Sequence, residues 1–150
     1  NLLLVYNNGS DISARSNMMS AALMGAVAFQ KGLGAVHALS HPIGAIYNTH
    51  HGLTNAVLLP HVLELNFTKI QYKINRLSDY IGIENGYDGF LSFIQELNSV
   101  LNVPNGLSEL GVLEEDIDRI IHSALKDPSK DGNPIKLNAK NLRALIATAM

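Results

Sequence analysis

Four of the six histidines fall within residues 37–51, a stretch without a single Lys, Arg, Asp or Glu side chain. They are His37, His41, His50 and His51. Imidazoles in apolar surroundings are neutral, and neutral imidazoles are good ligands for divalent first-row metals. Cysteine is absent, so any metal site has to draw its ligands from His, Asp and Glu. The stretch therefore predicts metal chemistry with nitrogen ligands.

His37 and His41 stand four residues apart, which places both side chains on one face of a helix. Two imidazoles at this spacing can reach one metal ion, as in the first half of an HExxH site. No glutamate lies between them, so a zinc protease is a poor interpretation. From spacing alone these two form the metal pair. A turn after Pro42 would bring one of the two later histidines back towards them.

Two ligands are too few, because a metal ion normally takes three or four from the protein. Asp11 is one candidate for a third ligand, but capping of the helix that follows explains it better. His61 and His122 are isolated in the sequence, and packing roles explain both. The alternative for the whole cluster is a set of packed, hydrogen-bonded imidazoles without a metal.

The elements that have to position these residues are helices. We expect helices over residues 12–30, 53–66, 67–81, 88–101, 113–126 and 138–150, and the second of these can run on into the third. A shorter helical piece over 36–40 is expected to be stopped or kinked by Pro42. Residues 44–52 and 127–134 are expected to form loops. Pro60 is expected to kink the helix that contains it. Residues 1–9 form an edge strand or the end of a helix. The helix over 12–30 is apolar on most sides and is expected to be central and buried. The predicted fold class is an all-α, multi-helix domain.

The composition fits one globular domain, with 150 residues of which 47% are hydrophobic and 16% charged. The net charge is −2 and the basic residues are scattered, so nucleic acid is excluded as a partner. The longest apolar run, residues 21–29, is too short for a membrane span. Absence of cysteine is compatible with a reducing cytoplasm, and we expect a cytoplasmic location.

Residues 32–66 read GLGAVHALSHPIGAIYNTHHGLTNAVLLPHVLELN and closely resemble the signature segment of iron-dependent alcohol dehydrogenases. The family pattern is approximately G-x-x-H-x-x-x-H-P-(L/I)-G, then six residues, then H-G-x-x-N-A-x-x-L-P, and every fixed element has a match. The apolar helix before the segment, and the pairs Asp127-Pro128 and Asn133-Pro134 after it, resemble the family more weakly. The resemblance implies that residues 1–150 are the carboxy-terminal, metal-binding helical domain of a longer enzyme.

The resemblance also implies roles for single residues. The two signature iron ligands fall on His37 and His51, fourteen residues apart. His41 matches a histidine that faces the nicotinamide and the substrate, so it is the implied catalytic and cofactor-contacting residue. His50 receives no role. The implied cofactors of the full-length enzyme are Fe²⁺, with Zn²⁺ as the alternative, and NAD or NADP.

The rest of the family's site is missing from this sequence. The family uses two more ligands, an Asp and a His four residues later, on an earlier helix, and no such pair precedes His37. The amino-terminal nucleotide-binding half, with its G-x-G-x-x-G loop, is missing as well. We therefore expect that domain as a partner, together with homo-oligomers, and we expect the isolated chain to be inactive.

The implied activity of the whole enzyme is hydride transfer between a small primary alcohol or aldehyde and NAD(P). Two alternatives stay open. One is a related enzyme on the same scaffold, such as a zinc-dependent glycerol dehydrogenase or a dehydroquinate synthase. The other is a helical metal-binding or interaction module without enzymatic activity.

Overall fold

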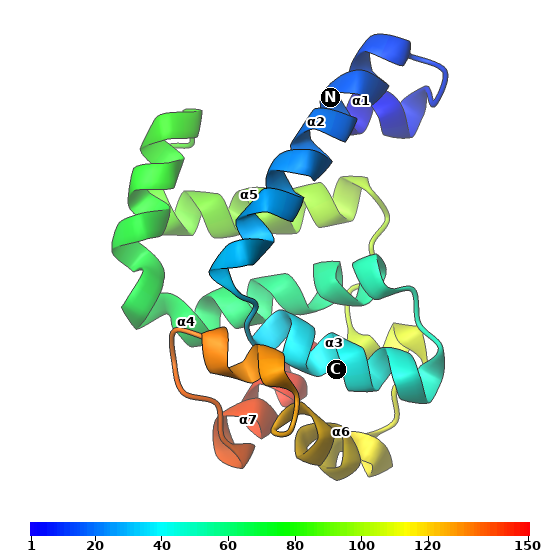
Figure 1. Cartoon of the computed structure of the whole chain (residues 1–150), viewed down its shortest axis with the longest axis vertical. Coiled ribbons are helices and arrows are strands. Elements are labelled where there is room, and N and C mark those ends of the chain that lie inside the picture. Colours follow the sequence, from blue (N-terminus) through cyan, green and yellow to red (C-terminus); the bar gives the residue numbers. More distant parts are fainter. The chain divides into compact units, whose positions relative to one another are not determined.

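The structure is a computed structural model that describes all 150 residues, and every regular element in it is helical. The α-helices are α1 (Leu2–Asn7), α2 (Ile12–Ala28), α3 (Ala35–Tyr47), α4 (His51–Ile81), α5 (Gly86–Val100), α6 (Ile117–Ala124) and α7 (Ala139–Ala149) (Figure 1). Short 3-10 helices are η1 (Phe29–Lys31), η2 (Leu107–Leu110), η3 (Glu114–Asp116) and η4 (Pro128–Gly132). The predicted all-α class is confirmed. The chain divides into two compact units, residues 1–32 and residues 33–150.

The first unit is a pair of helices, α1 and α2. The edge strand considered for residues 1–9 is wrong, because Leu2–Asn7 form a helical turn and a half before the Asn8-Gly9 turn. Leucine is a good helix former, which favours this outcome over a short apolar strand. The Asp11 carboxylate accepts a hydrogen bond from the Ala14 amide at 2.9 Å, so Asp11 caps α2 as predicted.

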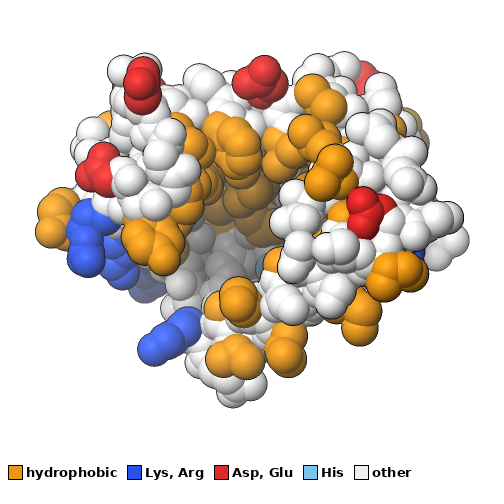
Figure 2. Space-filling model, turned by 90° about the horizontal axis from the view of Figure 1, so that it is seen from above, with side chains coloured by type: hydrophobic (Ala, Val, Ile, Leu, Met, Phe, Trp, Pro, Cys, Tyr) orange, Lys and Arg blue, Asp and Glu red, His pale blue; other side chains and the backbone are white.

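Helix α2 is apolar, but in this chain it is not buried. Only Ala14 among its 17 residues is buried, whereas Met19, Leu23 and Met24 are 74%, 68% and 72% exposed. Figure 2 shows apolar side chains gathered in several groups on the face seen there, with few basic side chains beside them. The expectation of a central, buried helix is therefore wrong for this chain. Within its own unit, α2 has only the short helices α1 and η1 as packing partners.

Helix α3 runs through Pro42, which the sequence reasoning expected to stop or kink it. Proline lacks an N–H and crowds the preceding turn. Here the residues around it lie in the core: Pro42 is buried and Ile43 is 0% exposed, so packing holds the helix together across the proline. The helix ends at Asn48, which adopts the left-handed conformation (φ 53°) and donates its N–H to the Gly44 carbonyl at 2.9 Å. The predicted loop over 44–52 shrinks to residues 48–50.

Helix α4 is 31 residues long and continues through Pro60. The two helices predicted over 53–66 and 67–81 are thus one element, which was the continuous alternative. It ends at Gly82, whose φ of 75° is the left-handed conformation that glycine adopts without strain. Helix α6 is shorter than the predicted helix over 113–126, because residues 114–116 form η3 instead. The predicted loop over 127–134 contains η4.

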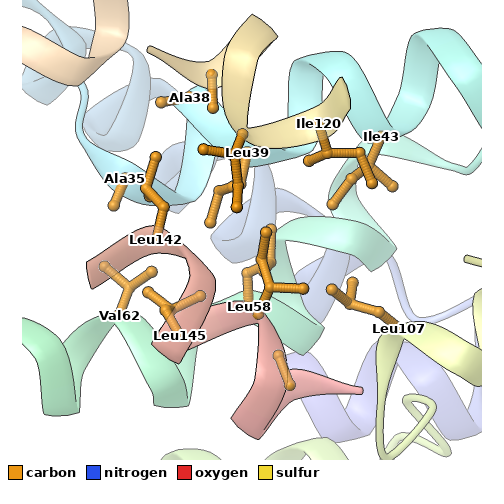
Figure 3. Close-up of a cluster of buried hydrophobic side chains, with 14 of the residues drawn as sticks. Ala35, Ala38, Leu39, Ile43, Leu58, Val62, Leu107, Ile120, Leu142 and Leu145 are labelled. Carbon is orange, nitrogen blue, oxygen red and sulfur yellow. The ribbon is translucent and has the colours of Figure 1, made fainter. Parts of the chain in front are cut away.

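The core of the second unit is one cluster to which α3, α4, α6 and α7 all contribute side chains (Figure 3). Its fully buried side chains include Ala35, Ala38, Leu39 and Ile43 of α3, Leu58 of α4, Ile120 of α6, and Leu142 and Ile146 of α7. The α3 members recur every three to four residues and define one face of the helix. His37 and His41 therefore lie on the opposite side of α3, away from the core. No single helix is long and apolar enough to cross a membrane.

Candidate active site

Three histidine rings meet where α3 and the start of α4 lie side by side. The ring centroids of His37 and His41 are 5.7 Å apart, those of His37 and His51 are 5.2 Å apart, and those of His41 and His51 are 5.6 Å apart. The three-residue connection after Tyr47 reverses the chain and carries His51 back towards α3. The turn foreseen from the sequence thus exists, although it comes six residues after Pro42 and not directly behind it.

The Nε2 atoms of His37 and His51 face one common point. The side-chain amide nitrogen of Asn55 lies 3.1 Å from Nε2 of His51 and 3.4 Å from Nε2 of His37. If the amide donates to these nitrogens, both imidazoles carry their proton on Nδ1, which is the form that ligates a metal through Nε2. The Asn55 carbonyl oxygen is buried and has no hydrogen-bond partner. Sequence reasoning matched Asn55 to the family pattern but gave it no role.

These donors fit part of a metal site. Two neutral imidazoles converging on one point suit a divalent first-row ion, and a buried amide oxygen beside them is a further polar group without a partner. No group of three or more His, Asp or Glu side chains in the chain is arranged to hold a metal. The assignment of His37 and His51 as ligands stays a prediction, and further ligands would have to come from outside this chain.

One Asp-x-x-x-His spacing does occur in the chain, at Asp118 and His122 in α6, after the signature segment and not before it. The Asp118 side chain is 82% exposed and pairs with Arg143. His122 is also exposed. Neither residue joins the three histidine rings in a metal-binding group.

His37 is half-buried, and its surroundings favour the neutral imidazole. Burial lowers the pKa of His37, and the neighbouring imidazoles of His51 and His41 lower it further because two positive rings at this distance repel. A metal ligand must be unprotonated, so a lowered pKa suits this position.

His41 has a partner that the sequence did not reveal. Its Nδ1 atom lies 2.8 Å from Oδ2 of Asp127, which follows α6 and stands 86 residues later in the chain. The Asp127 side chain is only 14% exposed, whereas that of His41 is 44% exposed. Burial alone would raise the pKa of Asp127, but hydrogen bonds from His41 and Ser129 outweigh it and hold that pKa below its usual value. Asp127 is therefore a carboxylate.

A hollow of about 380 Å³ opens beside this pair. His41 and Asp127 form part of its wall, together with Ile46, Arg119 and Ser123. It gives the His41–Asp127 pair access to solvent and to small molecules.

The other histidines lie outside the cluster. His50 is the residue before α4, and its Nδ1 accepts the Leu53 N–H at 3.3 Å, so it caps the helix that carries His51. His61 is partly buried on α4 with Nδ1 unpartnered, and burial lowers its pKa. The capping role of His50 could not be read from the sequence, since histidine is not among the preferred capping residues.

A reciprocal pair of amides fixes the start of α3. Asn66 of α4 and Asn133, after η4, each donate to the other's carbonyl oxygen at 2.9 Å. The Asn133 oxygen also accepts the Ala35 N–H at 3.1 Å, at the first residue of α3. A Cβ added to Gly34 would lie 3.0 Å from this oxygen, so a side chain there would press on the contact. The pair thus connects α3, α4 and the segment after Asp127.

Comparison with known proteins places this arrangement in a family. A family model described as "Fe-containing alcohol dehydrogenase family, C-terminal" matches residues 1–150. The chain is 38% identical over 152 residues to a 4-hydroxybutyrate dehydrogenase of Cupriavidus necator, covering 95% of this chain and 40% of the relative. It is 36% identical to a 1,3-propanediol dehydrogenase of Citrobacter freundii, covering 94% and 38%.

A solved structure of a 1,3-propanediol oxidoreductase superposes with a TM-score of 0.94 at 33% identity, covering 100% of this chain and 41% of that one. The chain thus spans about 40% of the length of the curated relatives it matches. The fold and the match along the whole chain agree: the chain belongs to the Fe-containing alcohol dehydrogenase family and matches its carboxy-terminal part.

Proposed function

We propose that this chain is the carboxy-terminal helical domain of a metal-dependent alcohol dehydrogenase that transfers hydride between a small primary alcohol or aldehyde and NAD or NADP. The observation that carries the proposal is the convergence of His37, His41 and His51 inside the segment that matches the family. The relatives named for 4-hydroxybutyrate and 1,3-propanediol support short primary alcohols as the substrate class.

His37 and His51 are the residues of this chain that would hold the metal, through the two Nε2 atoms that face the Asn55 amide. When bound, a divalent ion such as Fe²⁺, with Zn²⁺ as the alternative, supplies Lewis acidity towards the substrate oxygen. The imidazoles provide no negative charge. We expect an Asp and a His from the preceding part of the full-length protein to complete the ligand set.

His41 is the proposed catalytic residue and contacts the nicotinamide and the substrate in the full-length enzyme. Its imidazole can accept a proton from the substrate hydroxyl during alcohol oxidation and return it in the reverse direction. The exposed edge of His41 and the hollow beside it allow that proton to pass to solvent. Hydride chemistry belongs to the nicotinamide, and the protein contributes position and charge.

The preceding part of the full-length protein is the proposed partner of this chain. It would carry the nucleotide-binding fold, and its length corresponds to the roughly 60% of the relatives that this chain does not cover. The exposed apolar side chains of α2 are surface that such a domain could cover. We also propose a cytoplasmic, homo-oligomeric enzyme, and an isolated chain without dehydrogenase activity.

Metal analysis of three variants of the full-length protein tests the proposal. We expect His37→Ala and His51→Ala to abolish metal retention, because each removes a ligand. We expect His41→Ala to keep the metal and to lower the turnover of a primary alcohol with NAD(P). Equal metal loss in all three variants would refute the division of roles, and a full-length protein that neither binds metal nor oxidises alcohols would favour the non-enzymatic module.

A further inference from the structure

We propose that Asp127 is a positioning residue that fixes the ring orientation and the tautomer of His41. The inference rests on the proton-transfer role proposed above for His41, and it concerns a residue outside the signature segment. Its basis is the 2.8 Å contact between Asp127 Oδ2 and His41 Nδ1, which joins the loop after α6 to α3.

Hydrogen bonds of its side chain and of its backbone hold Asp127 in place. Its Oδ1 atom accepts the Ser129 N–H at 2.8 Å. Its backbone N–H donates to the carbonyls of Ser123 and Ala124 at 3.1 and 3.2 Å, at the end of α6. One oxygen is thus committed to its own loop, and the other is left to face His41. A fixed acceptor of this kind can orient a ring that is otherwise 44% exposed.

The protonation of the pair follows from this geometry. A carboxylate has only acceptors, so a neutral His41 facing it must carry its proton on Nδ1. The lone pair is then on Nε2, on the other side of the ring, where a substrate hydroxyl or a water can donate to it. Without Asp127, the ring can rotate and the proton can sit on either nitrogen. Asp127 therefore selects the form of His41 that can act as a base through Nε2.

The substitution Asp127→Asn keeps a hydrogen-bond partner for the His41 ring but reverses which ring nitrogen carries the proton. The Ser129 N–H still needs an acceptor, so we expect the amide oxygen to remain there and the amide nitrogen to face His41. This nitrogen donates, so the Nδ1 atom of His41 must accept and its proton must move to Nε2. Asp131→Asn is the matched control, because Asp131 lies in η4, the 3-10 helix that Asp127 caps, and its side chain is 77% exposed.

Nitrogen NMR of the histidine rings in this chain, at a pH where they are neutral, gives the first readout. We expect His41 to be protonated on Nδ1 in the unchanged chain and in Asp131→Asn, and on Nε2 in Asp127→Asn. A proton on Nε2 of His41 in the unchanged chain overturns the proposal, and this measurement needs no variant to fold.

Steady-state kinetics of the full-length protein with a primary alcohol and NAD(P) gives the second readout. We expect Asp127→Asn to lower kcat by about ten- to a hundredfold, with a KM for the alcohol within about threefold of the unchanged enzyme. Metal content should stay the same, since His37 and His51 are unchanged.

Three kinetic results distinguish a failure of the proposal for Asp127 from a failure of the proposed function. Asp127→Asn with an unchanged kcat overturns the proposal, and so does a loss that Asp131→Asn reproduces. A full-length protein that oxidises no alcohol refutes the proposed function instead, and the ring protonation of His41 then decides alone whether Asp127 sets its tautomer.

Discussion

Helices α2 and α3 are both rich in small and apolar residues, yet they differ in how much of each is buried. In α3, six of 13 residues are buried, and the two histidines occupy the side away from the core. In α2, one of 17 residues is buried, and no polar side chain interrupts the apolar residues from Ala21 to Phe29. The difference teaches that apolar character predicts burial only where a partner surface lies within the same chain. Helix α3 has α4, α6 and η4 as partners, and within its unit α2 has only the short helices α1 and η1.

The largest expected effect tests the buried face of α3. Leu39→Ala removes a side chain that is 0% exposed and should lower the free energy of unfolding by about 2–5 kcal/mol, because it leaves a cavity in the core. The matched change in α2 is Leu23→Ala, at a position 68% exposed, and it should change that free energy by less than about 0.5 kcal/mol. Urea unfolding of the chain followed by circular dichroism measures both. Equal losses would mean that α2 is as well packed as α3.

A smaller effect is expected where polar contacts fix the start of α3. Asn133→Ala leaves the buried Asn66 amide and the Ala35 N–H without their partner, which should lower the free energy of unfolding by about 1–3 kcal/mol. Asn105→Ala is the control, since Asn105 is exposed and its side-chain amide donates a hydrogen bond to Glu109, four residues later. If both variants unfold at the same urea concentration as the unchanged chain, the amide pair contributes nothing to the stability of the fold.

The smallest expected change in free energy concerns the histidines at the contact between α3 and the start of α4. Asn55→Asp places a carboxylate beside the Nε2 atoms of His37 and His51 and so supplies a third ligand to the chain itself. Affinity for Co²⁺ should rise on the order of tenfold or more, or about 1.4 kcal/mol, measured by visible absorption during titration. Adding His51→Ala to the same variant should cancel the gain. If Asn55→Asp leaves the Co²⁺ affinity unchanged, the imidazoles of His37 and His51 do not share one metal position.

Much of the fold could be predicted from the sequence, because helices are encoded locally. The periodicity of apolar residues located the helices after residue 12, and Asp11 was identified as a cap from its type and place. One error arose where packing overrides a local rule. Pro42 stays inside α3 and does not end it, since buried contacts hold the chain on both sides of this proline. Pro60 lies inside a helix, as predicted.

In the candidate site, too, the contacts between residues close in sequence could be predicted, and those between distant residues could not. His37, His41 and His51 lie within fifteen residues, so their spacing and one turn were enough to predict that they meet. Asp127 and Asn133 reach α3 from 86 and 98 residues away. A single sequence carries no signal for such pairings, because nothing in the type or spacing of these residues specifies the contact. The exposure of α2 could not be predicted either. The pattern of apolar residues predicts a helix, but it does not identify the surface that packs against that helix.

The short connection between α3 and α4 also has a consequence for the order of folding. Residues 48–50 join two helices that pack directly on each other, so His37 and His51 are brought together by contacts local in sequence. Local contacts close early because little loop entropy is lost, whereas the contact from Asp127 must wait for α6 to dock. On a ribosome, the two imidazoles can be adjacent before the residues after α4 have been synthesised. The two imidazoles proposed as metal ligands therefore come together while the chain is still growing, and His41 gains its carboxylate partner only afterwards.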